Sequence, residues 1–188
     1  MERDFIIDVS PQFCVFVAAM VLLLPLPWLV GLLLAAMVHE TFHCLTLLAC
    51  GRKIYHISVG VNGAKIYTDD LSWGETVVCS LAGPMGGFLL VKASKVFPQL
   101  AVCGLLQSVY NMLPVFPLDG GRALQGIAHL LLSDLWACRF CRGVEYLTLL
   151  LLISLGLLSA FVWHLGLLPL ILALIFALRV GKRKRPCK

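Results

Sequence analysis

The sequence predicts an all-α polytopic membrane protein with about six transmembrane helices and a small β-hairpin between the second and third helices. Of its 188 residues, 60% are apolar and only 13% are charged, against about 45–50% and roughly 25% in soluble domains. Several apolar runs approach the ~20 residues that a helix needs to cross a bilayer. Because no repeat or linker divides the chain, residues 1–188 are expected to form a single membrane-embedded domain.

The expected spans can be placed along the chain. They cover about 11–24, 27–50, 74–97, a stretch from Gln99 into "NMLPVFPLDGGR", 143–163 and 165–180, with an interfacial helix over 123–136. Between the second and third spans, "YHISVGV" alternates apolar with smaller or polar residues and is followed by Asn62-Gly63. An Asn-Gly pair between two such runs is a strong signal for a hairpin.

The distribution of positive charge indicates the orientation of the chain. With six spans and both termini in the cytoplasm, thirteen of the fifteen lysines and arginines lie inside, and only Lys92 and Lys95 lie outside. This agrees with the positive-inside rule. The basic tail, 179–188, is therefore expected to be cytoplasmic and to contact anionic lipid. So short a tail does not indicate nucleic-acid binding.

The second span carries ionisable residues in an apolar run, "LLLAAMVHETFHCLTLLAC". His39, Glu40 and His43 form an H-E-x-x-H motif, in which the i, i+4 spacing places both imidazoles on one helix face and Glu40 beside them. Chance produces this motif in roughly 2 per thousand chains of this composition. An unpaired charge at this depth costs about 2.5–3.5 kcal/mol. The motif therefore predicts a metal site with Glu40 as general base.

A catalytic zinc takes three protein ligands, so a third must come from elsewhere in the chain. The candidates are His56, His129, His164, Asp119 and Asp134. Asp119 stands out because it follows a segment broken by two prolines, and broken helices at membrane depth line buried or wet cavities. Counted from the outer face, His39 and His43 lie ~18 and ~24 Å along a helix, and Asp119 lies at most ~30 Å along its own. The three side chains can reach the same depth.

Three stretches of this sequence resemble signatures of the site-2 protease family of intramembrane zinc metalloproteases. "HETFH" matches H-E-x-x-H, "AGPMGG" is similar to G-P-x-x-N, and "NMLPVFPLDGGR" matches N-x-x-P-x-x-P-L-D-G. The resemblance implies that His39, His43 and Asp119 bind one Zn²⁺, that Glu40 is catalytic and that Asn111 positions the substrate. It is greatest for the compact six-span branch, which implies a multi-pass protein of the bacterial cytoplasmic membrane.

The sequence also departs from the family pattern. Gly87 stands where the family has asparagine, and neither a ligand-sensing (CBS) domain nor a PDZ domain follows. We therefore expect regulation through a separate membrane protein, if it is regulated, and not through a built-in sensor. The glycines of "AGPMGG" are expected to allow close helix packing. Cys138 and Cys141 have metal-like spacing, but no second pair completes a four-ligand site, so reduced thiols at a helix end are expected.

These observations predict an intramembrane metalloendopeptidase that hydrolyses peptide bonds of membrane-spanning or membrane-associated proteins, with Glu40 activating a zinc-bound water. One alternative is a multi-span zinc transporter, because some zinc permeases also place H-E-x-x-H in a span. A transporter should show a second polar span, whereas the third, fifth and sixth spans hold few such groups. The other alternative is a catalytically silent membrane scaffold.

Overall fold

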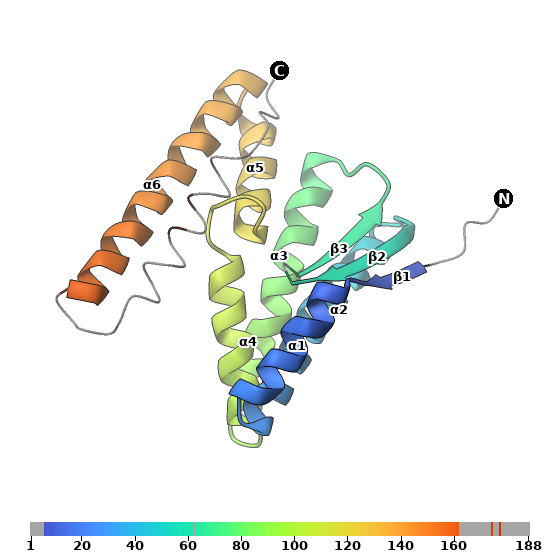
Figure 1. Ribbon diagram of the computed structural model, residues 1–188. Helices are drawn as coiled ribbons and strands as arrows, with labels where there is room; N and C mark the ends of the chain where they lie inside the picture. Colours follow the sequence, from blue (N-terminus) through green and yellow to red (C-terminus); the bar gives the residue numbers. More distant parts are fainter. Residues whose placement is uncertain (1–5, 62, 162–173, 175–176, 178–188) are drawn as a thin grey trace. The chain divides into compact units, whose positions relative to one another are not determined.

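The computed structural model describes residues 6–61, 63–161, 174 and 177 (Figure 1). The chain divides into two compact units, residues 1–112 and 113–188. The first unit holds β1 (Ile6–Val9), α1 (Pro11–Leu23), α2 (Leu26–Ala49), β2 (Ile54–Gly60), β3 (Gly63–Thr68), α3 (Trp73–Leu89), the short 3₁₀ helix η1 (Leu90–Ala93) and α4 (Pro98–Asn111). In the second unit the described elements include α5 (Asp119–Leu131) and α6 (Asp134–Phe161).

Helices long and apolar enough to cross a membrane confirm the predicted class. Within the described residues there are three of them, namely α2, α3 continued by η1, and α6; α1 is a shorter apolar helix. The predicted sixth span and the basic tail lie outside the described residues, apart from the isolated positions 174 and 177. The chain is thus a helical membrane protein with a small sheet.

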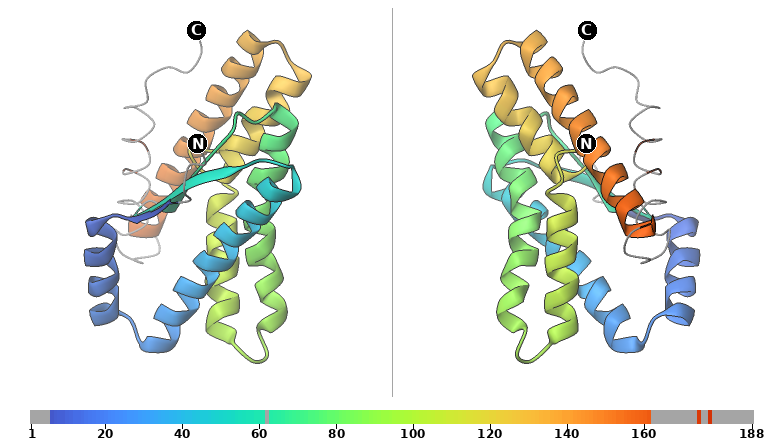
Figure 2. Two further views of the ribbon diagram at one scale, coloured as in Figure 1. Left: turned by 90° about the vertical axis from the view of Figure 1, so that its right-hand side faces the viewer. Right: turned by 90° about the vertical axis from the view of Figure 1, so that its left-hand side faces the viewer.

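In the first unit, α2, α3 and α4 pack side by side, as Figure 2 shows. Helices α3 and α4 meet at Gly87 and Gly104, where a Cβ added to Gly87 would lie 2.7 Å from the Gly104 carbonyl oxygen. The buried Ser108 hydroxyl on α4 fills the remaining space and donates to the Pro84 carbonyl at 2.9 Å. An asparagine at position 87 could not fit without separating these helices. This close packing explains why the chain has glycine there.

The predicted hairpin is present and belongs to a three-stranded sheet with the order β1-β2-β3. Strands β2 and β3 are antiparallel, with Gly60 opposite Gly63, and Gly63 has a φ of +100° that glycine adopts readily. Asn62 of the predicted turn lies outside the described residues. Strand β1 pairs in parallel with β2, Ile7 opposite Ile57. The sequence did not predict β1, because four residues are too few for a clear alternating pattern.

Three helix boundaries differ from those expected: the end of α4, the start of α5 and the start of α6. Helix α4 ends at Asn111, before the two prolines, so its 14 residues extend only ~21 Å. The expected interfacial helix over 123–136 is α5, which begins at Asp119 and ends at Leu131. Helix α6 begins at Asp134, well before position 143, and its first turn binds α5 through a 2.9 Å contact between His129 Nδ1 and Asp134 Oδ1. The start of α6 was not recognised in the sequence because the first turns of the helix are polar.

The cysteine pair on α6 meets the expectation only in part. Cys141 is not disulfide-bonded, and its thiol donates to the Leu124 carbonyl oxygen at 3.9 Å. Cys138 is disulfide-bonded, so the expectation of two reduced thiols was wrong for this residue.

Candidate functional site

The H-E-x-x-H motif lies on α2, inside a helix long enough to span a membrane. Proline near its start and the absence of any proline after Pro27 allow an uninterrupted helix of 24 residues through the motif. The i, i+4 spacing brings the two imidazoles together on one face, with His39 Nε2 3.2 Å from His43 Nε2. His39 is only 3% exposed. The expected pairing of these two residues is confirmed.

The orientation of His43 is fixed by α3. Its Nδ1 atom donates to the Cys79 carbonyl oxygen at 2.7 Å. A histidine that binds metal commonly uses its second nitrogen in this way, which fixes the tautomer and leaves the Nε2 lone pair available. The backbone of a neighbouring helix therefore fixes the orientation of the His43 ring.

Asn111, at the end of α4, contacts the same pair. Its side-chain amide donates to His39 Nε2 at 3.3 Å. Asn111 donates to His39, and the Cys79 carbonyl accepts from Nδ1 of His43. If both imidazoles are neutral, their Nε2 lone pairs therefore point into the same space. Two lone pairs 3.2 Å apart repel unless they share a proton or bind a common cation. The nitrogen donors present therefore fit a metal such as zinc.

The glycines of "AGPMGG" allow α3 to approach this pair. A Cβ on Gly83 would meet the Nε2 atom of His43 and lie 2.7 Å from both neighbouring ring carbons, and one on Gly86 would lie 2.7 Å from the Phe42 ring. Glycine is needed at both positions because any side chain would fill space that α2 occupies. The interpretation of this motif as a close-packing element is confirmed.

Glu40 faces the sheet. Its Oε1 atom accepts from the Ala64 backbone N–H at 3.4 Å, and a Cβ on Gly63 would lie 3.9 Å from the same oxygen. The first residues of β3 therefore contact the carboxyl group of Glu40, the residue that follows His39 in the sequence. This contact was not predicted, although the position of the hairpin immediately after the motif helix was.

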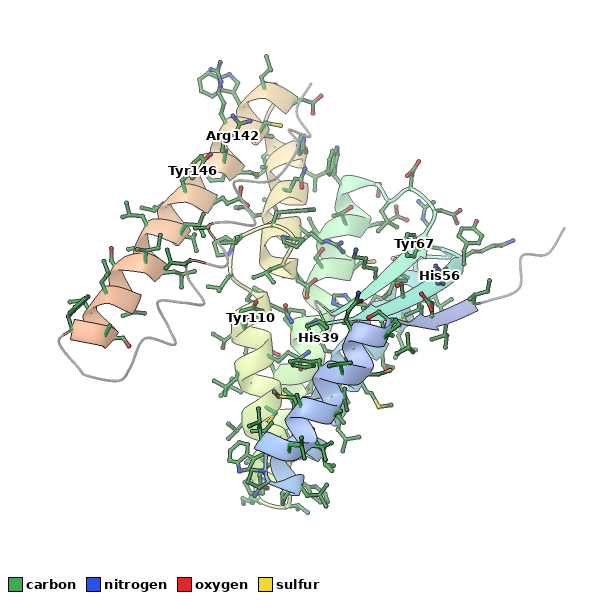
Figure 3. The ribbon with its side chains drawn as sticks, viewed as in Figure 1. His39, His56, Tyr67, Tyr110, Arg142 and Tyr146 are labelled. Atoms are coloured by element: carbon green, nitrogen blue, oxygen red, sulfur yellow. The ribbon has the colours of Figure 1, made fainter. Side chains whose placement is uncertain are left out.

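The other candidate ligands of the first unit have different surroundings. His56 stacks on Tyr67 across β2 and β3, with ring centroids 5.1 Å apart (Figure 3). Within the described part of this unit, no third histidine, cysteine, aspartate or glutamate joins His39 and His43. A third protein ligand of these types would thus come from residues 113–188. His164 lies outside the described residues.

In the second unit, Asp119 is the first residue of α5 and follows the loop 113–118. The loop is folded back on itself, with backbone bonds from Val115 N to Leu113 O at 2.7 Å and from Leu118 N to Val115 O at 2.9 Å. Its Phe116 N–H donates to Glu145 Oε1 on α6 at 3.1 Å. Glu145 is 8% exposed. Sequence reasoning missed this residue, although a carboxyl in an apolar helix was a signal that could have found it.

Comparison of the sequence with protein-family models and with curated proteins finds no match. Among solved structures, the chain is similar to the site-2 protease from Methanocaldococcus jannaschii, with a TM-score of 0.65 and 19% sequence identity. The similarity covers 97% of this chain and 93% of that one. At this identity the likeness is one of fold, and it agrees with the resemblance carried by the three motifs. The chain therefore has the fold of a site-2 protease.

Proposed function

We propose that this protein is an intramembrane zinc metalloendopeptidase of the site-2 protease type. The observation that carries the proposal is the histidine pair on α2, whose Nε2 atoms converge at 3.2 Å while the Cys79 carbonyl orients His43. The pair lies in a helix of spanning length, in a chain with a site-2 protease fold. A metal site of this kind at membrane depth supports hydrolysis of peptide bonds within or beside the bilayer.

The proposed metal ligands are His39, His43 and Asp119, holding one Zn²⁺ per chain. Two imidazole nitrogens and one carboxylate oxygen are a donor set that zinc accepts, and three protein ligands leave one position open for catalysis. Asp119 is proposed as the third because it starts α5 directly after the proline-containing loop and matches the family's aspartate motif. The lack of a third ligand among the described residues of the first unit supports the same choice.

Zinc, when bound, would polarise a peptide carbonyl and lower the pKa of a water molecule towards ~7. Glu40 would take a proton from the attacking water and deliver one to the leaving amine. Its present acceptor contact with the Ala64 N–H is at 3.4 Å, long enough to be exchanged easily for a water molecule. Asn111 donates to His39 Nε2 in the structure; with that lone pair bound to zinc, its amide would be released to donate to the substrate carbonyl and so orient it.

The substrates proposed are membrane-spanning or membrane-associated proteins, cut near the cytoplasmic face. A helix conceals its peptide bonds, so the substrate segment must unwind before water can attack it. The chain would be a multi-pass protein of the bacterial cytoplasmic membrane with both termini in the cytoplasm. Its partners would be the substrate, the lipid bilayer and, where activity is controlled, a separate regulatory membrane protein.

The decisive experiment compares the wild-type protein with Glu40→Gln in cells that co-express tagged membrane substrates. We expect Glu40→Gln to abolish cleavage while the purified protein keeps its zinc, because the change removes the base and leaves the ligands. Glu75→Gln is the control for loss of a carboxylate, since glutamine also serves at this helix-capping position and the Glu75 carboxylate binds Arg52 through both oxygens. Cleavage that continues unchanged in Glu40→Gln would refute the proposed mechanism.

A further inference from the structure

The proposed reaction does not use Glu145, the buried carboxyl of α6. This side chain is 8% exposed and lies within a 28-residue helix that is apolar enough to cross a membrane. Ionisable groups in such helices are costly, and they are retained where a specific partner requires them. Among the described residues, the hydrogen-bond partner of Glu145 is a backbone amide.

That amide is in the loop that leads into α5. The Phe116 N–H donates to Glu145 Oε1 at 3.1 Å. Phe116 lies between Pro114 and Pro117, neither of which has an N–H of its own. Three residues later the chain reaches Asp119, the first residue of α5. An anchor at Phe116 therefore acts within one turn of the proposed third zinc ligand.

The surroundings of the loop leave it little freedom. Val115 is fully buried and forms a core with Leu149, one helical turn after Glu145, with Leu118 packed against it. On the other side, a Cβ on Gly121 would lie 2.6 Å from the Phe116 nitrogen. The Phe116 amide is thus confined between the first turn of α5 and one face of α6. Glu145 supplies the polar contact at this point, and Leu149 supplies the apolar one.

We propose that Glu145 is a positioning residue, which fixes the loop 113–118 and thereby sets where the Asp119 carboxylate points. The metal part of this inference rests on the proposed function, because it assumes that Asp119 binds zinc. The structural part does not, because the Phe116 contact lies entirely within the second unit. Groups that hold a metal ligand in place without touching the metal typically change metal affinity about 10- to 100-fold when they are removed.

The test uses three variants of the full-length protein in detergent. Glu145→Leu removes the acceptor and keeps an apolar side chain of similar volume. Glu145→Gln keeps an oxygen that accepts from Phe116. Thr148→Val is the control on the same helix, because its hydroxyl donates to the Val144 carbonyl of that helix, one turn away. The first readout is hydrogen–deuterium exchange of the peptide that covers residues 113–121, and the second is zinc affinity measured by chelator competition.

We expect Glu145→Leu to speed exchange of the Phe116 amide about 5- to 30-fold, as loss of one buried hydrogen bond predicts. Zinc affinity should fall about 10- to 100-fold in the same variant. Glu145→Gln and Thr148→Val should both stay within about threefold of the wild type, a margin narrower than the loss of one such bond. This pattern would support a positioning role, because the conservative variant rescues both readouts.

Two results would overturn the proposal. One is unchanged exchange in Glu145→Leu, which would mean that the carboxyl does not order the loop. The other is faster exchange in that variant with unchanged zinc affinity, which would mean that the loop does not set the ligand. A wild-type protein that binds no zinc would instead refute the proposed function, and the exchange data would still decide whether Glu145 orders the loop.

Discussion

Gly83→Ala tests the closeness of α3 to the histidine pair. In the structure an added Cβ would meet His43 Nε2 and lie 2.7 Å from both adjacent ring carbons. Ordinary van der Waals contacts begin near ~3.5 Å, so the imidazole would have to retreat by roughly 1 Å. It cannot do so and keep its 2.7 Å bond to the Cys79 carbonyl. The smallest possible side chain would therefore displace a proposed zinc ligand.

The expected loss of zinc affinity follows from the small displacement of a ligand that a metal site tolerates. Zinc–ligand distances vary by only about 0.2 Å, so a shift of roughly 1 Å removes His43 as a ligand. We expect zinc affinity to fall at least ~100-fold, the upper end of the loss when a group that only supports a ligand is removed, or about 2.8 kcal/mol. Helix propensity acts in the opposite direction, because alanine is favoured over glycine by about 0.5–1 kcal/mol in a helix interior. A loss therefore cannot be attributed to weaker helix formation.

The assay is zinc content and affinity of the purified protein, with cobalt substitution to report ligand geometry by absorption. Gly74→Ala is the matched control, since Gly74 lies near the start of the same helix and an added Cβ meets nothing within 4 Å. It should retain full zinc affinity. The reasoning is refuted if Gly83→Ala binds zinc within about threefold of the wild type, because a 1 Å displacement is incompatible with that result.

Two further predictions concern the loop and the sheet. Gly121→Ala should prevent stable folding of the second unit, because its Cβ would lie 2.5 Å from the Val115 carbonyl carbon, a backbone atom that cannot move away. The control is Gly143→Ala, whose added Cβ meets nothing within 4 Å and which should keep the Tm of the wild type. An equal Tm for both variants would contradict the prediction. The Tyr55 hydroxyl donates to Asp69 at 2.6 Å and lowers the pKa of that carboxyl. The stability that this hydrogen bond contributes is therefore present above the pKa that Asp69 has in the unfolded state, and it is lost as the pH falls. When the pH is lowered from about 6 to about 3, the Tm should therefore fall less in Tyr55→Phe than in the wild type. An equal fall in Tm would count against a stabilising role of the Tyr55–Asp69 hydrogen bond.

Much of the candidate site was predictable because it depends on local geometry. The i, i+4 spacing of His39 and His43 fixes their common face in any α-helix, which allows their nitrogens to approach to 3.2 Å. The hairpin was predictable for the same reason, since alternation and a turn signal are both short-range patterns. Gly83 was expected to allow close packing, although its contact partner was not predicted.

Other features depended on contacts between residues distant in the sequence. The Cys79 carbonyl that orients His43 and the Ala64 amide that contacts Glu40 are backbone groups, which carry no residue-specific signal. Strand β1 was missed because its pairing with β2 crosses the whole of α1 and α2. The start of α6 was misplaced for a different reason, because its first turns carry polar residues that are not typical of a membrane span.

The sequence by itself determined that this is a membrane protein and which side chains are candidates to bind a metal. Apolar composition requires a membrane, and two histidines with a glutamate at helical spacing in an apolar run require a reason such as metal. The tertiary structure alone decided how those groups are held: the tautomer of His43, the space that Gly83 leaves for its ring, and the buried carboxyl of Glu145 beneath the loop that leads to Asp119. The physical reason is that side-chain type follows from the chain, whereas hydrogen-bond partners and close approaches exist only where distant segments meet.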